Sequence, residues 1–343
     1  MTYAIQADGL VKRFGDTEAL AGVSLTAQAG TVLGVLGPNG AGKTTTTRIL
    51  ATLIEPTGGS ARVGGFDVVK EAHKVRQLIG LTGQYAGVDE MLTGTENLIL
   101  IGRLLGIPRR ESRARAAELL ERFQLTEAAE RAAKTYSGGM RRRLDLAASL
   151  VGRPQILFLD EPTTGLDPRS RNGLWDIVRG LTDDGVTVLL TTQYLEEADQ
   201  LADDIVVIDR GQVIAHGTSD TLKSQVGGQV LEVRPLQESD VAAASRIVGE
   251  MAGAEPEARD GMVSVPITDP QLMPAVVRRL DDAGVTVGEL SLRKSSLDEV
   301  FFALTGHHTD DIEAEADALA GSTDLKASDK ATDKASDKEG ASA

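Results

Sequence analysis

The chain has 343 residues, a formal net charge of −15 at pH 7 and no cysteine. That length suffices for about two domains, and the lack of cysteine excludes a disulfide framework and any thiolate metal site. Nucleic-acid binding requires clustered Lys and Arg that neutralise phosphates, so a strongly acidic balance argues against a broad nucleic-acid surface. No nucleic-acid partner is therefore expected.

Nothing in the sequence predicts a membrane span or a secretory signal. The first residues, Met1–Leu10, lack a basic segment followed by an apolar run. The most apolar window, Leu98–Ile107, is interrupted by Arg103 and two glycines, whereas a bilayer span needs about 20 predominantly apolar residues. Work at a membrane would require docking onto a separate membrane-spanning protein.

Residues 1–226 alternate short aliphatic runs with helical stretches, a pattern typical of an α/β domain. Runs bounded by Gly, Pro or Asp are predicted to be strands buried on both faces; they are Thr31–Leu36, Gln155–Leu159 and Val186–Leu190. Pro108–Phe123 has apolar or Ala positions at helical spacing among many Arg and Glu. This spacing predicts an exposed amphipathic helix.

A smaller pattern over residues 227–306 predicts a small α+β accessory domain. The expected strands are Val230–Val233, Met262–Val265 and Val285–Leu290, and the expected helices lie near Ser239–Met251, Leu272–Asp282 and Ser296–Leu304. Ser296 followed three residues later by Glu299 is a capping-box signature. Residues 307–343 are rich in Ala, Asp, Glu, Lys and Ser. Such a composition cannot bury enough apolar surface to offset chain entropy, so a disordered acidic tail is expected.

A phosphate-binding loop is predicted at residues 37–44. Gly-Pro-Asn-Gly-Ala-Gly-Lys-Thr follows a predicted strand and precedes a helix, the context that a P-loop requires. The glycines let backbone N–H groups turn inward around phosphate oxygens, and the helix N-terminus directs its positive dipole end toward them. Lys43 supplies charge for the β- and γ-phosphates, Thr44 a hydroxyl for Mg²⁺, and Thr45 reaches the α-phosphate side.

The predicted ATP-binding residues of this loop are Gly37, Pro38, Asn39, Gly40, Ala41, Gly42, Lys43, Thr44 and Thr45. The alternative is a glycine-rich turn that only lets a strand and a helix pack. It leaves the placement of the lysine and the hydroxyl unexplained.

An acidic pair follows the predicted strand that ends at Leu159. A carboxylate there lies at the carboxyl edge of a parallel sheet, where α/β folds bind ligands. Asp160 is therefore expected to hold Mg²⁺, and Glu161 to accept the proton of the attacking water. An acidic pair that merely caps a strand end is the alternative, and the neighbouring P-loop argues against it.

Ser137, Gly138, Gly139 and Met140 resemble the signature motif of ABC ATPases, as does the surrounding block Tyr136–Leu146. The family usually has Leu and Gln at the positions of Tyr136 and Met140. The resemblance implies an α/β P-loop NTPase of ABC-ATPase type. Its cassette would span residues 1–226, with a RecA-like core and a helical subdomain at about 88–150. It also implies that the signature contacts the γ-phosphate held by a second subunit, so that hydrolysis depends on dimerisation.

Other family elements follow in order along the chain. By the resemblance, Phe14 stacks on adenine, although an isolated Phe is usually a core residue. Gln84 corresponds to the Q-loop glutamine, which senses metal and water and adjoins the membrane partner, and Asp167 closes the D-loop. Gln193 stands where the family has a switch histidine. Gln can hydrogen-bond the γ-phosphate but cannot gain charge near neutral pH.

Residues 191–203, residues 297–301 and the accessory region are similar to the daunorubicin-resistance ATP-binding family of drug exporters. This resemblance implies a homodimeric, MgATP-hydrolysing subunit that lies peripherally on the cytoplasmic side of the cell membrane. It would drive efflux of a drug or hydrophobic secondary metabolite through a separate permease, present in two copies.

Two other classes of function fit the sequence less well. Soluble ABC ATPases that act on ribosomes or nucleic acid usually carry two cassettes, long coiled-coil insertions or basic extensions. This chain has one cassette, no heptad run and an acidic tail. A nucleotide-dependent scaffold without useful hydrolysis would rest on Gln193 alone.

Overall fold

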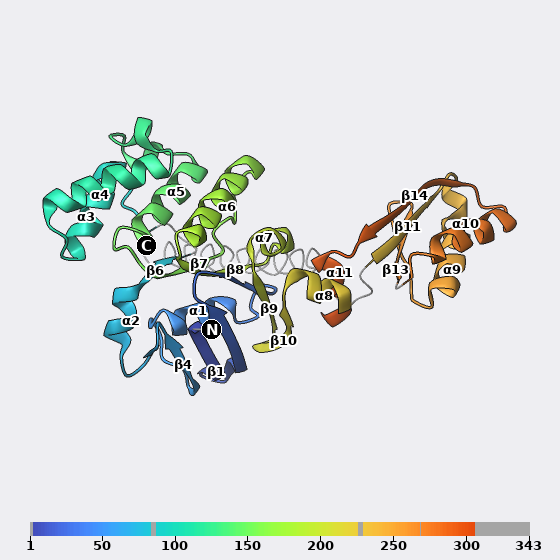
Figure 1. Cartoon of the computed structure of the whole chain (residues 1–343), viewed down its shortest axis with the longest axis horizontal. Helices are drawn as coiled ribbons and strands as arrows, with labels where there is room; N and C mark the ends of the chain where they lie inside the picture. The colour runs from blue at the N-terminus through green and yellow to red at the C-terminus, as the bar shows by residue number, and fades with distance from the viewer. Residues whose placement is uncertain (1–2, 84–86, 226–228, 268, 306–343) are drawn as a thin grey trace, which may run out of the picture.

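The computed structural model describes residues 3–83, 87–225, 229–267 and 269–305 (Figure 1). The expectations for Gln84 and for a tail over residues 307–343 lie outside these residues. No helix among those described is both long and apolar enough to cross a bilayer.

A six-stranded sheet forms the centre of the cassette, with strand order β10-β9-β3-β8-β7-β6. Its strands are β3 (Val32–Leu36), β6 (Ile79–Thr82), β7 (Ile156–Asp160), β8 (Thr187–Thr192), β9 (Asp204–Asp209) and β10 (Gln212–Gly217). All neighbours pair in parallel except β9 and β10. Every residue of β3, β7 and β8 is buried, which confirms the three predicted strands.

A second, antiparallel sheet packs beside α1 (Lys43–Leu50) and has the order β2-β1-β4-β5. Its strands are β1 (Tyr3–Phe14), β2 (Thr17–Gln28), β4 (Gly58–Val63) and β5 (Phe66–Asp67). Residues of this sheet, of α1 and of the central strands share one apolar cluster, which includes Ile5, Leu10, Val35, Ile49 and Phe158. The sequence analysis did not predict this sheet. It matters here because β2 runs beside the P-loop.

Helices α2 (Ala72–Leu78), α6 (Pro168–Asp183) and α7 (Leu195–Leu201) surround the central sheet, and a helical layer lies on one side of it (Figure 1). The helical layer contains α3 (Gly94–Leu104), α4 (Arg109–Arg122) and α5 (Gly138–Ser149), with short 3₁₀ turns at Thr126–Ala128 and Ala133–Thr135. Helix α4 confirms the predicted amphipathic helix. A continuous core that includes Leu98, Leu119, Phe123 and Leu144 joins this layer to the sheet.

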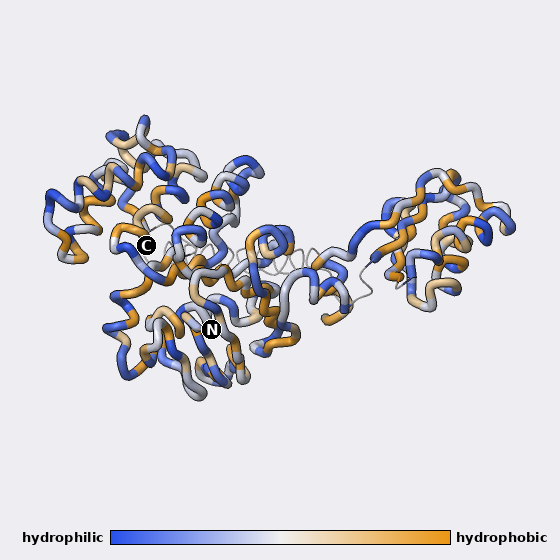
Figure 2. The backbone as a smooth tube through the Cα atoms, in the orientation of Figure 1, coloured by the Kyte–Doolittle hydropathy of each residue, from blue (hydrophilic) through white to orange (hydrophobic). Residues whose placement is uncertain are grey.

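The accessory region has its own antiparallel sheet, with strand order β12-β13-β11-β14. It comprises β11 (Gln229–Pro235), β12 (Glu257–Arg259), β13 (Met262–Ile267) and β14 (Val287–Lys294), together with α9 (Val241–Ala252) and α10 (Leu272–Asp282). These elements enclose a separate core that includes Leu231, Val248, Val263, Val276 and Leu280. Hydrophobic residues occur along the backbone of both the cassette and the accessory unit (Figure 2), and the accessory core shares no residue with the cassette clusters.

The last described helix, α11 (Leu297–Thr305), packs on the cassette rather than in the accessory core. Its Leu297, Val300 and Phe301 join a cluster with Leu36 of β3, Ala198 of α7 and Leu222 of α8 (Ser219–Gln225). The predicted capping box is present: Ser296 N donates to Glu299 Oε2 at 2.8 Å, and Glu299 N donates to Ser296 Oγ at 3.2 Å. The sequence pattern places this helix in the accessory region, and its packing on the cassette corrects that assignment.

Candidate active site

The P-loop joins β3 to α1, and its lysine is buried. Lys43 Nζ donates hydrogen bonds to the carbonyl oxygens of Gly37 at 2.8 Å and of Pro38 at 3.0 Å. It lies 3.3 Å from Glu161 Oε1. The ammonium group is therefore held over the loop, where a bound phosphate would meet it.

Two glycines of the loop are required by close packing. A Cβ at Gly37 would lie 2.1 Å from Ile208 O. Gly42, the N-cap of α1, has φ +111°, and a Cβ there would lie 2.6 Å from Leu20 Cδ2 and 2.9 Å from Ala19 O. Any side chain at these positions would push the loop away from β9 or β2. The two glycines are therefore required for the shape of the phosphate-binding loop.

The carboxyl end of β7 brings Asp160 against the first turn of α1. Asp160 Oδ1 accepts hydrogen bonds from Thr44 Oγ1 at 3.1 Å and from Thr191 Oγ1 of β8 at 2.6 Å. Asp160 is 6% exposed and Thr191 is fully buried. A buried carboxylate that two hydroxyl groups hold in place is preorganised to bind a cation or to accept a further hydrogen bond.

Glu161 has a left-handed backbone, with φ +48°. Such a conformation costs a non-glycine residue on the order of 1–3 kcal/mol and persists only where the surroundings enforce it. Its N–H donates to Thr191 O and to Thr191 Oγ1, both at 3.1 Å. The result is that the Glu161 side chain turns back toward Lys43 instead of following the strand direction.

The residues fit a Mg²⁺ ion bound with nucleotide. The hydroxyl of Thr44 and the carboxylate of Asp160 are oxygen donors of the kind that Mg²⁺ prefers. The described residues contain no cluster of three or more His, Cys, Asp or Glu that could hold a metal. Phosphate oxygens and water usually supply most of the other ligands of a Mg²⁺ ion that is bound with a nucleotide.

The signature and D-loop residues lie at the N-termini of two adjacent helices. Ser137 is the N-cap of α5, and its Oγ accepts Met140 N at 3.3 Å. Asp167 is the N-cap of α6 and accepts both Ser170 N at 2.9 Å and Ser170 Oγ at 2.6 Å; these bonds lower the pKa of the Asp167 carboxyl. A Cβ at Gly139 would lie 2.5 Å from Ser170 Oγ, so only glycine allows this approach.

Exposure separates these residues from the rest of the site. Ser137, Gly138 and Asp167 are exposed, whereas Lys43 and Asp160 are buried. The structure brings Lys43, Thr44, Asp160 and Glu161 together within one protomer. It leaves the signature on a surface that a second subunit could reach.

The other predicted site residues are placed as follows. Phe14 ends β1, is 51% exposed and carries Lys12 Nζ at 5.0 Å from its ring centroid. This exposure excludes the alternative that Phe14 is a core residue. Gln193 directly follows β8, and its Oε1 is buried without a hydrogen-bond partner among the described residues. Because amide O and N exchange positions by a flip, that group can present an N–H donor.

Sequence reasoning missed Thr191 and the buried Arg142. Thr191 is one of many strand threonines, and Arg142 lies in a run of three arginines. Neither carries a local signal, because only the packing of neighbouring elements brings them to the site. Arg142 is considered further below.

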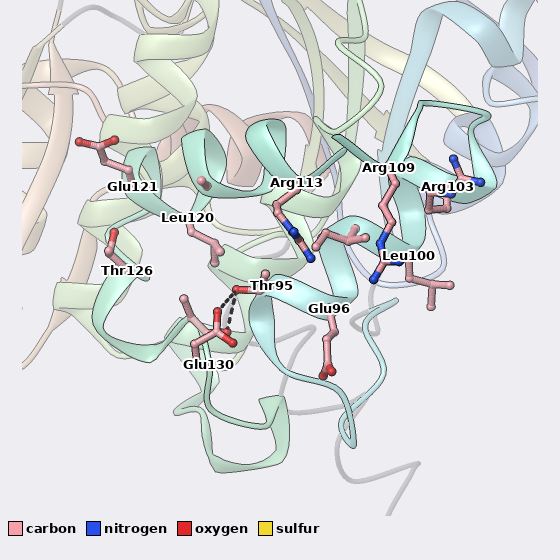
Figure 3. A pocket seen from close by; sticks show the side chains of 13 residues that line it. Thr95, Glu96, Leu100, Arg103, Arg109, Arg113, Leu120, Glu121, Thr126 and Glu130 are labelled. Atoms are coloured by element: carbon pink, nitrogen blue, oxygen red, sulfur yellow. Dashed lines mark hydrogen bonds between the residues drawn. The ribbon is translucent and has the colours of Figure 1, made fainter. Parts of the chain in front are cut away.

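A separate hollow of about 1240 Å³ lies between α3 and α4 (Figure 3). Thr95 Oγ1 donates to Glu130 Oε1 at 2.7 Å in this hollow, and Arg103, Arg109 and Arg113 lie together at its other end. It contains none of the motif residues and is not a candidate nucleotide site.

Comparisons with known proteins agree with this geometry. Residues 20–164 match the family model of the ABC transporter, and residues 217–305 match that of the ATP-binding protein DrrA1-3-like C-terminal domain. The solved ADP conformation of an ATP-binding cassette of an ABC transporter has a TM-score of 0.59 and 26% identity, covering 64% of this chain and 92% of its own. A dimeric, post-hydrolysis cassette bound to ADP and Pi has a TM-score of 0.57 and 27% identity, covering 62% and 98%.

Fold and site together define an ABC-type ATPase, the ATP-binding and ATP-hydrolysing subunit of an ABC transporter. The daunorubicin/doxorubicin resistance ATP-binding protein DrrA of Streptomyces peucetius is 55% identical over 92% of this chain and 96% of its own length. The doxorubicin resistance ATP-binding protein DrrA of Mycobacterium tuberculosis (strain ATCC 25618 / H37Rv) is 46% identical over 93% and 98%. The chain belongs to the daunorubicin-resistance ATP-binding family.

Proposed function

We propose that two copies of this chain use MgATP to drive efflux of a drug or hydrophobic secondary metabolite through a separate membrane permease. The observation that carries the catalytic part is the contact of Glu161 with Lys43 at 3.3 Å, directly after the strand that presents Asp160. The proposed base, Glu161, and the proposed phosphate-binding group, the Lys43 ammonium, are thereby in direct contact. The names of the relatives support the transport part.

Each residue of the pocket has a distinct task in this proposal. Lys43 and the amides of residues 37–45 bind the phosphates, and Thr44, Asp160 and Gln84 would hold the Mg²⁺ that neutralises their charge. Glu161 accepts the proton of the attacking water, and Gln193 donates a hydrogen bond to the γ-phosphate. Phe14, exposed at the end of β1, offers its ring to adenine.

Dimerisation completes the site. The exposed N-terminus of α5, with Ser137, Gly138, Gly139 and Met140, would bind the γ-phosphate held by the second copy, and Asp167 would lie at the same interface. The dimeric relative bound to ADP and Pi supports this arrangement. The γ-phosphate contacts both copies only in the closed dimer, so bound ATP favours the closed state. Hydrolysis removes the γ-phosphate contacts, and the dimer can then open.

A permease would dock in the cleft between the sheet edge at β6 and helix α3. This cleft has a volume of about 550 Å³ and is lined by Ile79, Leu81, Ile101, Leu105, Ile107 and Gly87. Leu105 is 57% exposed and the adjacent Leu104 is 78% exposed. Exposed leucines at the rim of a cleft are typical of a protein interface. Gly87, three residues after Gln84, lines the cleft. Docking of a permease would therefore be coupled to nucleotide binding through Gln84.

The chain would accordingly work at the cytoplasmic face of the cell membrane. Action on ribosomes or nucleic acid, the alternative, receives no support from the named relatives, which are resistance or export ATP-binding proteins. A Nod factor export ATP-binding protein I of Ralstonia nicotianae is 37% identical over 90% of this chain. Export is therefore favoured over import.

Efflux of doxorubicin from cells that co-express the chain and a candidate permease tests the proposal. Doxorubicin fluorescence retained in the cells should fall with the native chain and stay high with Glu161→Gln, at matched expression. Equal retention with both, or ATP hydrolysis that is indifferent to permease-containing membranes, would count against transport.

The docking cleft can be tested separately. Leu105→Glu should abolish copurification with the permease, whereas Leu236→Glu, on a residue of the accessory unit that is 70% exposed, should retain it. MgATP binding by both variants checks their folding. Copurification that survives Leu105→Glu would place the permease elsewhere.

A further inference from the structure

Arg142 lies on α5, the helix that the signature opens, yet its side chain points into the protein. It is 9% exposed and donates hydrogen bonds to four backbone carbonyls. Nε donates to Pro162 O at 2.8 Å, Nη2 donates to Asp160 O and Glu161 O at 3.2 Å each, and Nη1 donates to Gly83 O at 2.7 Å. One guanidinium group thus joins the signature helix to the end of β7 and to the residue before Gln84.

Asp145, one turn further along α5, extends this connection. Its Oδ2 lies 3.4 Å from Arg142 Nη1, and its Oδ1 accepts Gly87 N at 2.6 Å. Gly83 and Gly87 flank the segment 84–86, which is outside the described residues. The pair therefore holds both flanks of the segment that contains Gln84, and it does so from a helix that belongs to the signature.

The contact with Glu161 has the clearest consequence. Glu161 has a left-handed backbone that its own side-chain type disfavours. Arg142 satisfies the carbonyls on either side of its φ and ψ bonds, and Thr191 satisfies its N–H. A planar guanidinium can bind several carbonyls at fixed angles, which an ammonium cannot do. Displacement of α5 would therefore turn the Glu161 carboxylate away from Lys43.

We propose that Arg142, supported by Asp145, is a positioning residue for ATP hydrolysis that sets the orientation of Glu161 according to the position of the signature helix. Arg142 binds backbone carbonyls of residues 160–162 and would act through the Glu161 peptide. The inference rests on the proposed role of Glu161 as base. It explains how engagement of α5 by a second subunit reaches the catalytic carboxylate.

A double-mutant cycle of the full-length chain tests this. Arg142→Lys should lower kcat at least tenfold while the Kd for MgATP changes less than threefold, since a single ammonium cannot hold all four carbonyls. Arg122→Lys is the matched control, because Arg122 also bridges a carbonyl, Gly180 O at 3.2 Å, and a carboxylate, Asp184 at 2.7 Å, but lies on α4 away from the site. It should change neither constant more than twofold.

The cycle is completed in the Glu161→Gln background by single-turnover hydrolysis of radiolabelled ATP. If Arg142 acts through Glu161, adding Arg142→Lys to Glu161→Gln lowers the remaining rate less than threefold, because the group that it positions is already gone. A further tenfold loss, equal to the loss in the native background, overturns the proposal, as does native kcat in folded Arg142→Lys. Full native turnover in Glu161→Gln alone would instead refute the role of Glu161. Should Arg142→Lys not fold, Asp145→Asn takes its place in the same cycle, with the same two outcomes.

Discussion

Two adjacent phenylalanines on α11 offer a direct test of how this helix is anchored. Phe301 is 1% exposed in the cluster with Leu36, Ala198 and Leu222, whereas Phe302 is 41% exposed. Truncating a fully buried Phe to Ala costs about 3–5 kcal/mol, through lost apolar contact and the cavity left behind. Because the apolar contacts of α11 lie in one small cluster, Phe301→Ala should ease local detachment of this helix before it affects global unfolding.

Amide hydrogen exchange in the full chain measures that detachment. With a tenfold change per about 1.4 kcal/mol, exchange of the α11 amides should accelerate roughly 100- to 4,000-fold in Phe301→Ala, up to the limit set by the fully detached helix. Phe302→Ala should accelerate the same amides less than about tenfold. Detachment of α11 also exposes Leu222 of α8, so exchange of the α8 amides should accelerate as well.

Equal acceleration in both variants would refute the reasoning, since it would mean that burial of Phe301 does not anchor the helix. Acceleration that is confined to the core of β11–β14 would also refute it. That result would mean that α11 belongs to the accessory unit and not to the cassette.

Three further outcomes follow from the site. Glu161→Gln should retain MgATP binding, lower kcat by about 10²-fold or more and trap a dimer that size-exclusion chromatography detects; unchanged turnover would exclude Glu161 as the base. Thr191→Val removes the hydroxyl that bonds Asp160 and Glu161, costing about 1.5–3 kcal/mol of unfolding free energy and lowering kcat as well. Thr187, in the same strand as Thr191, accepts a hydrogen bond from Gly30 N, and Thr187→Val should reduce stability without lowering kcat; an equal loss of kcat in both variants would contradict the assignment. Burial raises the pKa of Glu197 above its ordinary value of 4.5, although Trp175 Nε1 donates to it. The folded state therefore holds this proton more tightly, and the group's stabilisation is complete below the unfolded pKa and lost as pH rises through the folded pKa. In that window Glu197→Gln should remove a stability slope of up to about 1.4 kcal/mol per pH unit; identical slopes in denaturant titrations would contradict this.

The residues that the sequence predicted best are those whose backbone is constrained locally. The spacing of Gly37, Gly42 and Lys43 after a short aliphatic run predicts a tight turn between a strand and a helix, and the aliphatic run before Asp160 favours a buried strand. In both cases the constraint and the residues that satisfy it lie within a few positions of each other. Local sequence therefore contains the information.

The residues that the sequence could not predict depend on packing between distant segments. Arg141, Arg142 and Arg143 are three identical residues in a row, and only the packing of α5 against the end of β7 decides that the middle one is buried. Its partners, Gly83 and Pro162, lie far from it in the sequence. Likewise the apolar spacing over residues 297–305 predicts a helix but cannot say which of two cores accepts it.

Helix α11 has a topological consequence. Because α8 and α11 contact each other on the cassette surface, the polypeptide leaves and rejoins the cassette at neighbouring points. The four-stranded unit is thus an insertion between two docked helices, even though it comes late in the sequence. Excision of residues 229–294 with a short linker would preserve the apolar cluster between α8 and α11. A stop after residue 226 would remove Phe301 and expose Leu222 and its neighbours in that cluster to solvent.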